Sequence, residues 1–151
     1  MIKDDYWIDG NVPSQKNSKE IVRIKKDGRE RILLVSSKNV QYYRKTRAIF
    51  LRNDRYSFLE SARDKGRPLF VGFYFVRDSK RIFDYHNAVH VIADMMVEEG
   101  WIVDDCMNEM VPVFLGYCVD KSKPGVYIRP LNMKYANALK DYNDYYGSKH
   151  K

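Results

Sequence analysis

The pattern of apolar and polar positions predicts a chain in which strands and helices are mixed. Short apolar or alternating runs predict strands, because alternate residues of a strand face opposite sides. These runs cover residues 6–10, 21–24, 32–35, 69–76, 101–103, 111–117 and 126–128, and residues 81–84 are expected to be a further extended segment. Residues 69–76 are apolar almost throughout, which is typical of a central strand buried on both faces. Asp27-Gly28 separates the second and third runs and predicts the tight turn of a β-hairpin.

Apolar positions spaced three or four residues apart predict the helices. The first helix is expected from residue 38 to about residue 53, and residues 55–67 are expected to form a short helix and a loop. The second helix is expected over residues 86–99, with Gly100 as its C-terminal cap. One arc of this helix collects its apolar side chains, which are Ala88, Val89, Ile92, Ala93, Met95 and Met96. A third helix is expected over residues 132–146.

The elements do not alternate strictly, and the sequence contains no internal repeat, low-complexity tract or interdomain linker. This order favours an α+β (mixed α/β) fold, with one compact domain over residues 1–151 and a mixed sheet packed against helices. A chain of 151 residues can bury about two-thirds of the surface that it exposes when unfolded. Residues 144–151 are expected to form a frayed C-terminal tail.

Composition favours a globular protein over a disordered or membrane-spanning one. The chain is 44% hydrophobic and 31% charged, and no apolar run approaches the roughly 20 residues that span a bilayer. The N-terminus lacks the apolar stretch of a secretory signal, so the expected location is the cytosol. Cys106 and Cys118 are too few for a disulfide framework or a four-cysteine zinc site, and are expected to be small, semi-buried hydrophobic residues.

Charge is divided unevenly along the chain. The net charge is +7 and the sequence pI is near 9.3, which favours polyanionic partners such as nucleic acid or an anionic membrane. Residues 1–81 hold 20 Lys and Arg against 10 Asp and Glu, whereas residues 82–120 hold eight acids and no Lys or Arg. The two parts suggest phosphate binding and cation binding as separate tasks, although ordinary variation in surface charge would give the same totals.

Candidate chemistry is concentrated in residues 84–105. Asp84 ends the extended segment before the second helix, and His86 and His90 follow at i, i+4 spacing. Asp104-Asp105 come after that helix, and the chain can fold back so that Asp84, His86 and Asp105 converge. Carboxylates suit Mg²⁺ or Mn²⁺, and imidazole suits Mn²⁺ or softer metals. A metal held there can stabilise charge on a phosphate and activate water for attack.

These residues also have ordinary structural interpretations. Asp84 is of a type favoured at helix N-termini. His86 and His90 fit the polar face of a helix, and Asp104-Asp105 fit a solvated turn. Asp94 either orients His90 or is simply exposed.

The same segment resembles a motif of the RusA family of Holliday junction resolvases. That motif has the form Asp-x-Asp-Asn-x-x-Lys near the start of a helix, followed by Asp, Gly and Asp-Asp. The matching positions here are Asp84-x-His86-Asn87-x-x-His90, then Asp94, Gly100 and Asp104-Asp105. An N-terminal loop of the form Gly-x-x-Pro-Ser-x-Lys-Asn, also found in the family, is matched by residues 10–17.

The resemblance implies that the protein is a metal-dependent DNA endonuclease and a divergent member of the family, of the type carried by phages or prophages. It would cleave four-way or other branched DNA with Mg²⁺ or Mn²⁺ and no small-molecule cofactor. The implied catalytic residues are Asp84, His86, His90 and Asp105, and the implied metal ligands are Asp84, His86, Asp105 and Asp104. His86 replaces the family's second Asp, which removes a negative charge and shifts preference towards Mn²⁺. His90 replaces a Lys and would act as a cation when protonated or as a second imidazole ligand.

Basic residues of the N-terminal half are expected to contact DNA phosphates, which gives salt-sensitive affinity independent of sequence. The candidates are Lys16, Lys19, Lys25, Lys26, Arg29, Arg31, Arg44, Lys45 and Arg47. Tyr42, Tyr43 and Tyr56 lie among them and would either stack on unpaired bases or pack in the core. The resemblance further implies a homodimer, which suits paired incisions on opposing strands of a junction; no membrane partner is expected.

Two other functions fit the same residues. A DNA-binding protein that keeps the fold but has lost catalysis would explain the two replaced motif positions. An RNA-directed nuclease or RNA-binding protein would have the same basic surface.

Overall fold

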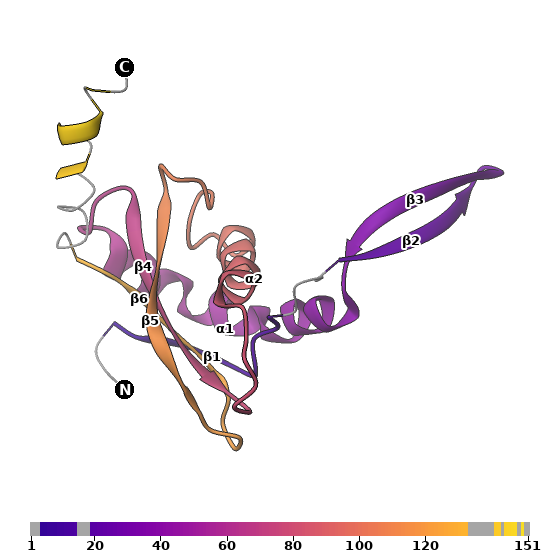
Figure 1. The fold of residues 1–151 in the computed structure, drawn as a ribbon, viewed down its shortest axis with the longest axis horizontal. Coiled ribbons are helices and arrows are strands. Elements are labelled where there is room, and N and C mark those ends of the chain that lie inside the picture. Colours follow the sequence, from indigo (N-terminus) through magenta and orange to yellow (C-terminus); the bar gives the residue numbers. More distant parts are fainter. Residues whose placement is uncertain (1–3, 15–18, 133–140, 143, 148, 150–151) are drawn as a thin grey trace.

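The structure is a computed structural model that describes residues 4–14, 19–132, 141–142, 144–147 and 149 (Figure 1). Its main sheet has four strands in the order β1-β6-β4-β5. Their bounds are Tyr6–Asp9 for β1, Leu69–Arg77 for β4, Met110–Val119 for β5 and Gly125–Pro130 for β6. β4 pairs parallel to β5 and antiparallel to β6, and β6 pairs antiparallel to β1. The predicted α+β fold with a mixed sheet and a buried central strand is therefore confirmed.

Two long helices complete the core. α1 covers Lys38–Ala62, and α2 covers Tyr85–Glu98 and forms the crossover between the parallel strands β4 and β5. The predicted apolar arc of α2 is buried as a whole. The indole ring of Trp101 stacks on Phe58 of α1, with ring centroids 4.2 Å apart, and its Nε1 donates to the Leu51 carbonyl at 2.7 Å. α1 and α2 therefore share one hydrophobic core with the sheet.

α1 is longer than the sequence pattern predicted. It continues without interruption to Ala62, so the expected break after residue 53 was wrong. Residues 52–55 are all charged or polar, which concealed the continuation. Leu51, Phe58 and Ala62 nevertheless return to the same side of the helix and are fully or almost fully buried.

The predicted hairpin is present and stands apart from the core. It is a two-stranded sheet of β2 (Lys19–Lys26) and β3 (Arg29–Ser36), closed by Asp27 and Gly28 with φ values of 55° and 73°. Positive φ at both positions is the geometry of the tightest hairpin turn. Figure 1 shows the hairpin projecting away from the main sheet beyond the start of α1. Ile21 and Ile32 are 71% and 67% exposed, and none of the described side chains of the hairpin belongs to the buried core.

Several local predictions differ from the structure. Residues 101–103 form no strand, because this segment has no pairing partner among the described residues; Trp101 and Ile102 instead turn into the core. Cys106 and Cys118 are free and exposed rather than semi-buried. Most of the predicted C-terminal helix lies outside the described residues, although residues 141–142 and 144–146 are helical. Among the described helices, none combines the length and apolar character needed to cross a membrane.

Candidate metal centre

Asp84 begins α2 as its N-terminal cap. Its backbone is extended (φ −88°, ψ 103°), and its Oδ1 accepts a hydrogen bond from the His86 N–H at 3.0 Å. Asp is favoured here because its side chain satisfies an N–H group that has no partner within the helix. The His86 Nδ1 lies 3.7 Å from the same oxygen. The capping interpretation of Asp84 is confirmed, and this role uses one of its two carboxylate oxygens.

The end of α2 turns the chain back towards the helix. Gly100 has a φ of 75°, and its N–H donates to the Val97 carbonyl at 3.2 Å. The Trp101 N–H donates to the Met96 carbonyl at 2.8 Å. This pair of bonds is a Schellman motif, which satisfies the free carbonyls at a helix C-terminus. Because Trp101 is also anchored in the core, the loop that carries residues 104–105 starts from a fixed position.

His90, Asp94 and Asp105 bring three candidate ligand atoms together. One possible ligand atom from each residue lies within 4.8 Å of the ligand atoms of the other two. His90 Nε2 and Asp94 Oδ2 are 3.5 Å apart, because i, i+4 residues are neighbours on a helix surface. Asp105 joins them from the loop after α2. We call these three residues the α2–loop cluster.

The α2–loop cluster fits a divalent cation by its chemistry and nearly by its dimensions. Two carboxylates and one imidazole suit Mn²⁺ or another transition metal better than Mg²⁺, which prefers oxygen alone. Opposite ligands of an ion with bonds of about 2.1 Å lie about 4.2 Å apart. A small side-chain movement would therefore close the cluster around one ion, and the exposure of His90 and Asp105 leaves room for it.

The predicted ligand set is divided by the structure. Asp105 and His90 belong to the α2–loop cluster, whereas Asp84 and His86 do not. His86 lines the same cavity of about 200 Å³ as His90 and Asp105, so it stands beside the cluster. Its ring stacks on Tyr85, with centroids 4.1 Å apart.

Asp104 faces a neighbouring cavity of about 270 Å³, which it shares with Asp94, Asp105 and Glu98. Its Oδ1 accepts a hydrogen bond from the Asp105 N–H at 2.8 Å, which holds the loop in shape. Arg44 enters this cavity from α1 and forms an ion pair with Glu98. The acidic centre therefore has a fixed cation at its edge.

No protein-family model matches this chain, and no curated protein matches it. The likeness to RusA-like resolvases rests on the motif residues alone.

The predicted DNA-contacting residues lie in different surroundings. Among these candidates, the exposed side chains are those of Lys25, Lys26, Arg29 and Arg31 on the hairpin and Lys45 on α1. Arg44 is partly neutralised by Glu98, and Arg47 is half-buried, with its Nε donating to the Asp9 carbonyl at 2.6 Å. Lys16 and the side chain of Lys19 lie outside the described residues.

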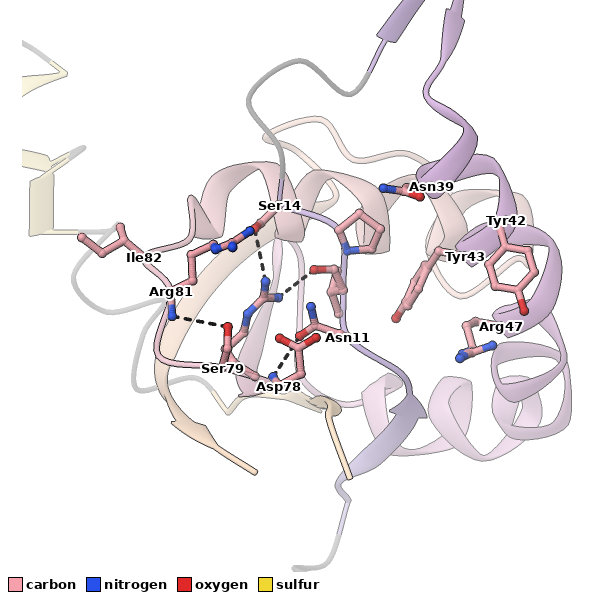
Figure 2. Close-up of a pocket in the computed structure, with 13 residues that line it drawn as sticks. Asn11, Ser14, Asn39, Tyr42, Tyr43, Arg47, Asp78, Ser79, Arg81 and Ile82 are labelled. Carbon is pink, nitrogen blue, oxygen red and sulfur yellow. Dashed lines mark hydrogen bonds between the residues drawn. The ribbon is translucent and has the colours of Figure 1, made fainter. Parts of the chain in front are cut away.

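Sequence reasoning missed a larger cavity of about 360 Å³, which we call the arginine cavity. It lies between the loop at residues 11–14, the first turns of α1 and the turn at residues 77–82 (Figure 2). Arg77 and Arg81 line it together with Arg47. Burial lowers the pKa of Arg77, an effect that Asp78 opposes. The available signal was an arginine placed directly after the buried residues of the central strand.

Proposed function

We propose that the protein is a metal-dependent, structure-selective endonuclease that hydrolyses phosphodiesters in four-way or other branched DNA. The observation that carries this proposal is the α2–loop cluster, His90, Asp94 and Asp105. It is formed by the helix and loop whose residues resemble the RusA-like motif. The uneven charge of the chain supports it, because an acidic centre on a basic protein suits a cation and a polyanion together.

The residues of the chain have separate tasks in this proposal. Asp94, Asp105 and His90 would hold the cation, and Asp84 would fix the start of α2 so that His90 keeps its position. A bound divalent cation would supply charge stabilisation at the phosphate during hydrolysis. Arg44, held by Glu98 beside the cluster, would attract the neighbouring phosphate of the strand. His86 lines the cavity and would contact the substrate there.

The basic hairpin would contact DNA beyond the cleavage site. Four exposed cations gather near its turn, namely Lys25, Lys26, Arg29 and Arg31. We also propose a homodimer, since two incisions on opposing strands suit a two-fold pair of sites. The proposed setting is the cytosol.

A DNA-binding protein without catalysis is the second candidate. Asp84 spends a carboxylate oxygen on the helix cap, and His86 and His90 stand where the resembled motif has Asp and Lys. The cap occupies an oxygen that could otherwise bind a cation, and the two histidines remove one negative and one positive charge that the motif would otherwise supply. Binding to branched DNA would then persist while cleavage would be absent.

The test is cleavage of a labelled mobile four-way junction by the purified protein. Reactions contain Mg²⁺, Mn²⁺ or chelator, with a linear duplex and a structured RNA as alternative substrates. We expect paired incisions in the junction, faster with Mn²⁺ than with Mg²⁺, and none with chelator.

The variant Asp105→Asn should abolish these incisions. Asp64→Asn is the matched control, because Asp64 is an exposed acid near the end of α1, remote in sequence from the cluster, and the substitution removes the same charge. Junction binding without cleavage in either metal would replace the proposal with the second candidate. Preferential cleavage of RNA would assign an RNA-directed nuclease instead.

A further inference from the structure

The arginine cavity is distinct from the α2–loop cluster and has the composition of an anion site. Three guanidinium groups line it, one from α1 and two from the turn at residues 77–82, and Asp78 is the one acid among its lining residues. The remaining polar lining includes the hydroxyl groups of Ser14 and Ser79. In Figure 2, Arg47 and Arg81 approach the cavity from opposite sides. The lining residues therefore carry an excess of positive charge.

The arginines of this cavity are not neutralised by ion pairs. Among the described residues, no carboxylate oxygen lies within 4.0 Å of a side-chain nitrogen of Arg47, Arg77 or Arg81. Other arginines of the molecule do have such partners, for example Arg44 with Glu98 and Arg52 with Glu99. Arginine side chains that converge without counter-ions repel one another when the cavity is empty, and a bound anion would replace this repulsion with attraction.

Two of the arginines are held in position before any ligand binds. Arg77 is 7% exposed, and its guanidinium donates to the Val12 carbonyl at 2.7 Å and to Ser14 Oγ at 3.2 Å. It also lies 4.4 Å from the centre of the Phe83 ring. Arg47 is fixed by its bond to the Asp9 carbonyl. A guanidinium has five N–H donors, so both groups keep donors for a ligand.

Tyr43 adds a donor that has no partner. It lines the cavity and is 4% exposed, and its hydroxyl lacks a hydrogen-bond partner among the described residues. Figure 2 shows the hydroxyl directed from α1 towards the loop at residues 11–14. Buried hydroxyls are almost always hydrogen-bonded, so an unsatisfied one indicates a partner that is not part of the chain. An oxyanion in the cavity would supply it.

We propose that the arginine cavity is a phosphate-binding site. Guanidinium groups favour phosphate because their N–H donors match its oxygens in pairs. A cavity of about 360 Å³ exceeds a phosphate group, and the ring of Tyr42, 67% exposed, borders the remaining space. A sugar or base attached to the phosphate has room beside this ring. That the phosphate belongs to a nucleic-acid strand rests on the proposed function; the phosphate site itself does not.

The position of the site along the chain suits a strand that reaches the α2–loop cluster. Ile82 lines the arginine cavity, and His86 lines the cavity of His90 and Asp105. Only the short segment of residues 83–85 separates them in sequence. The two cavities are therefore lined by neighbouring parts of the chain, and one nucleic-acid strand contacting both would join the phosphate site to the cluster.

The test compares Arg81→Gln with Lys80→Gln in metal-free buffer. Both side chains are exposed and adjacent, and each substitution removes one positive charge, but only Arg81 lines the cavity. Calorimetry measures binding of inorganic phosphate, thymidine 5′-monophosphate and a short thymidine oligonucleotide. We expect Arg81→Gln to weaken phosphate binding about tenfold and Lys80→Gln to change it by less than about twofold.

The three probes identify the source of the phosphate. If the oligonucleotide shows the same difference between the variants, the ligand is a strand phosphate. If only the two small probes show it, the ligand is a free phosphorylated compound. If no probe distinguishes Arg81→Gln from Lys80→Gln, or none binds, the proposal is wrong. Because metal is absent, a protein that fails to cleave DNA would leave these outcomes unaffected.

Discussion

At the scale of single residues, the candidate metal centre depends on which acid joins His90. The sequence identified Asp105 and both histidines but paired them with Asp84, because Asp84 precedes the helix at the motif position. The structure uses Asp84 as a cap and brings Asp94 to within 3.5 Å of His90. The i, i+4 spacing of His90 and Asp94 was visible in the sequence. The approach of Asp105 to that pair was not, because it depends on how the loop after α2 turns.

The variant His90→Gln should weaken Mn²⁺ binding by roughly tenfold to a hundredfold, whereas His86→Gln should change it much less. His90 contributes a donor atom to the α2–loop cluster, and His86 only lines the adjacent cavity. Both histidines are exposed on α2, so the two variants are matched in burial and in chemistry. Calorimetric titration with Mn²⁺ measures the difference. A greater loss in His86→Gln would favour the set of ligands expected from the motif.

Replacing Tyr43 with Phe should stabilise the protein by about 1 kcal/mol, because it removes a buried hydroxyl that has no partner. Burial raises the pKa of Tyr43 above the ordinary tyrosine value of about 10. The folded state thus holds the proton more tightly than the unfolded state, so the wild-type protein loses stability as the pH rises above that value. Tyr43→Phe lacks this loss, and its advantage should grow by up to about 1.4 kcal/mol per pH unit.

Urea unfolding at about pH 8 and about pH 11 measures both effects of Tyr43→Phe. The other tyrosines titrate equally in the two proteins and cancel in the comparison. A variant that is less stable than the wild type at the lower pH would mean that the hydroxyl has a partner in solution.

At the scale of elements, patterns set by local spacing were predictable and patterns set by pairing were not. The buried strand β4, the hairpin turn at Asp27-Gly28 and the capping of α2 by Gly100 follow from local sequence. Residues 101–103 look like a strand but are held by Trp101 in the core, a contact between distant residues. The polar stretch inside α1 concealed a continuing helix, because the core contacts that continue the helix are made by residues on either side of that stretch, such as Leu51 and Phe58.

Gly100→Ala should destabilise the protein by about 1–3 kcal/mol and weaken Mn²⁺ binding. Gly100 has a φ of 75°, and an added Cβ would lie 2.7 Å from the Arg55 Nε. The displaced turn would move Asp105 away from α2. Gly28→Ala is the control, since Gly28 has a φ of 73° with no atom within 4 Å of an added Cβ. Equal Mn²⁺ affinity in Gly100→Ala and wild type would show that the turn at Gly100 does not position the α2–loop cluster.

The hairpin should contribute to DNA affinity and little to stability. Replacing Lys25, Lys26, Arg29 and Arg31 together with Gln should weaken junction binding and reduce the dependence of log affinity on log salt by up to about 4 units. The free energy of unfolding should change by less than about 0.5 kcal/mol, because these side chains are exposed.

The control for the hairpin variant is the double substitution of Arg52→Gln on α1 and Arg63→Gln directly after it. These arginines are also exposed, but they pair with Glu99 and Glu60. If the affinity for DNA falls as much per charge removed in this control as in the hairpin variant, the hairpin makes no specific contact and contributes only through the net charge of the protein.

At the scale of the whole molecule, the sequence showed the uneven distribution of charge but not how the charged side chains are arranged in space. The acidic segment at residues 82–120 and the basic N-terminal half were evident from composition. The arginine cavity was not, because Arg47 lies 30 or more residues before Arg77 and Arg81 and meets them only when α1 packs against the rest of the fold. Arg47 was expected to contact phosphate; the structure places it in the lining of this cavity, with its Nε donating to the Asp9 carbonyl.

The most direct test of the account is the rate of four-way junction cleavage in Mn²⁺ by Asp94→Asn compared with wild type. Asp94 belongs to the α2–loop cluster in the structure, whereas the motif alone did not identify it as a ligand. We expect the wild type to cleave and Asp94→Asn to be slower by roughly a hundredfold or more, equivalent to about 2.7 kcal/mol of lost transition-state stabilisation. Undiminished cleavage by Asp94→Asn, or no cleavage by the wild type, would contradict the assignment of His90, Asp94 and Asp105 as the metal centre of a DNA endonuclease.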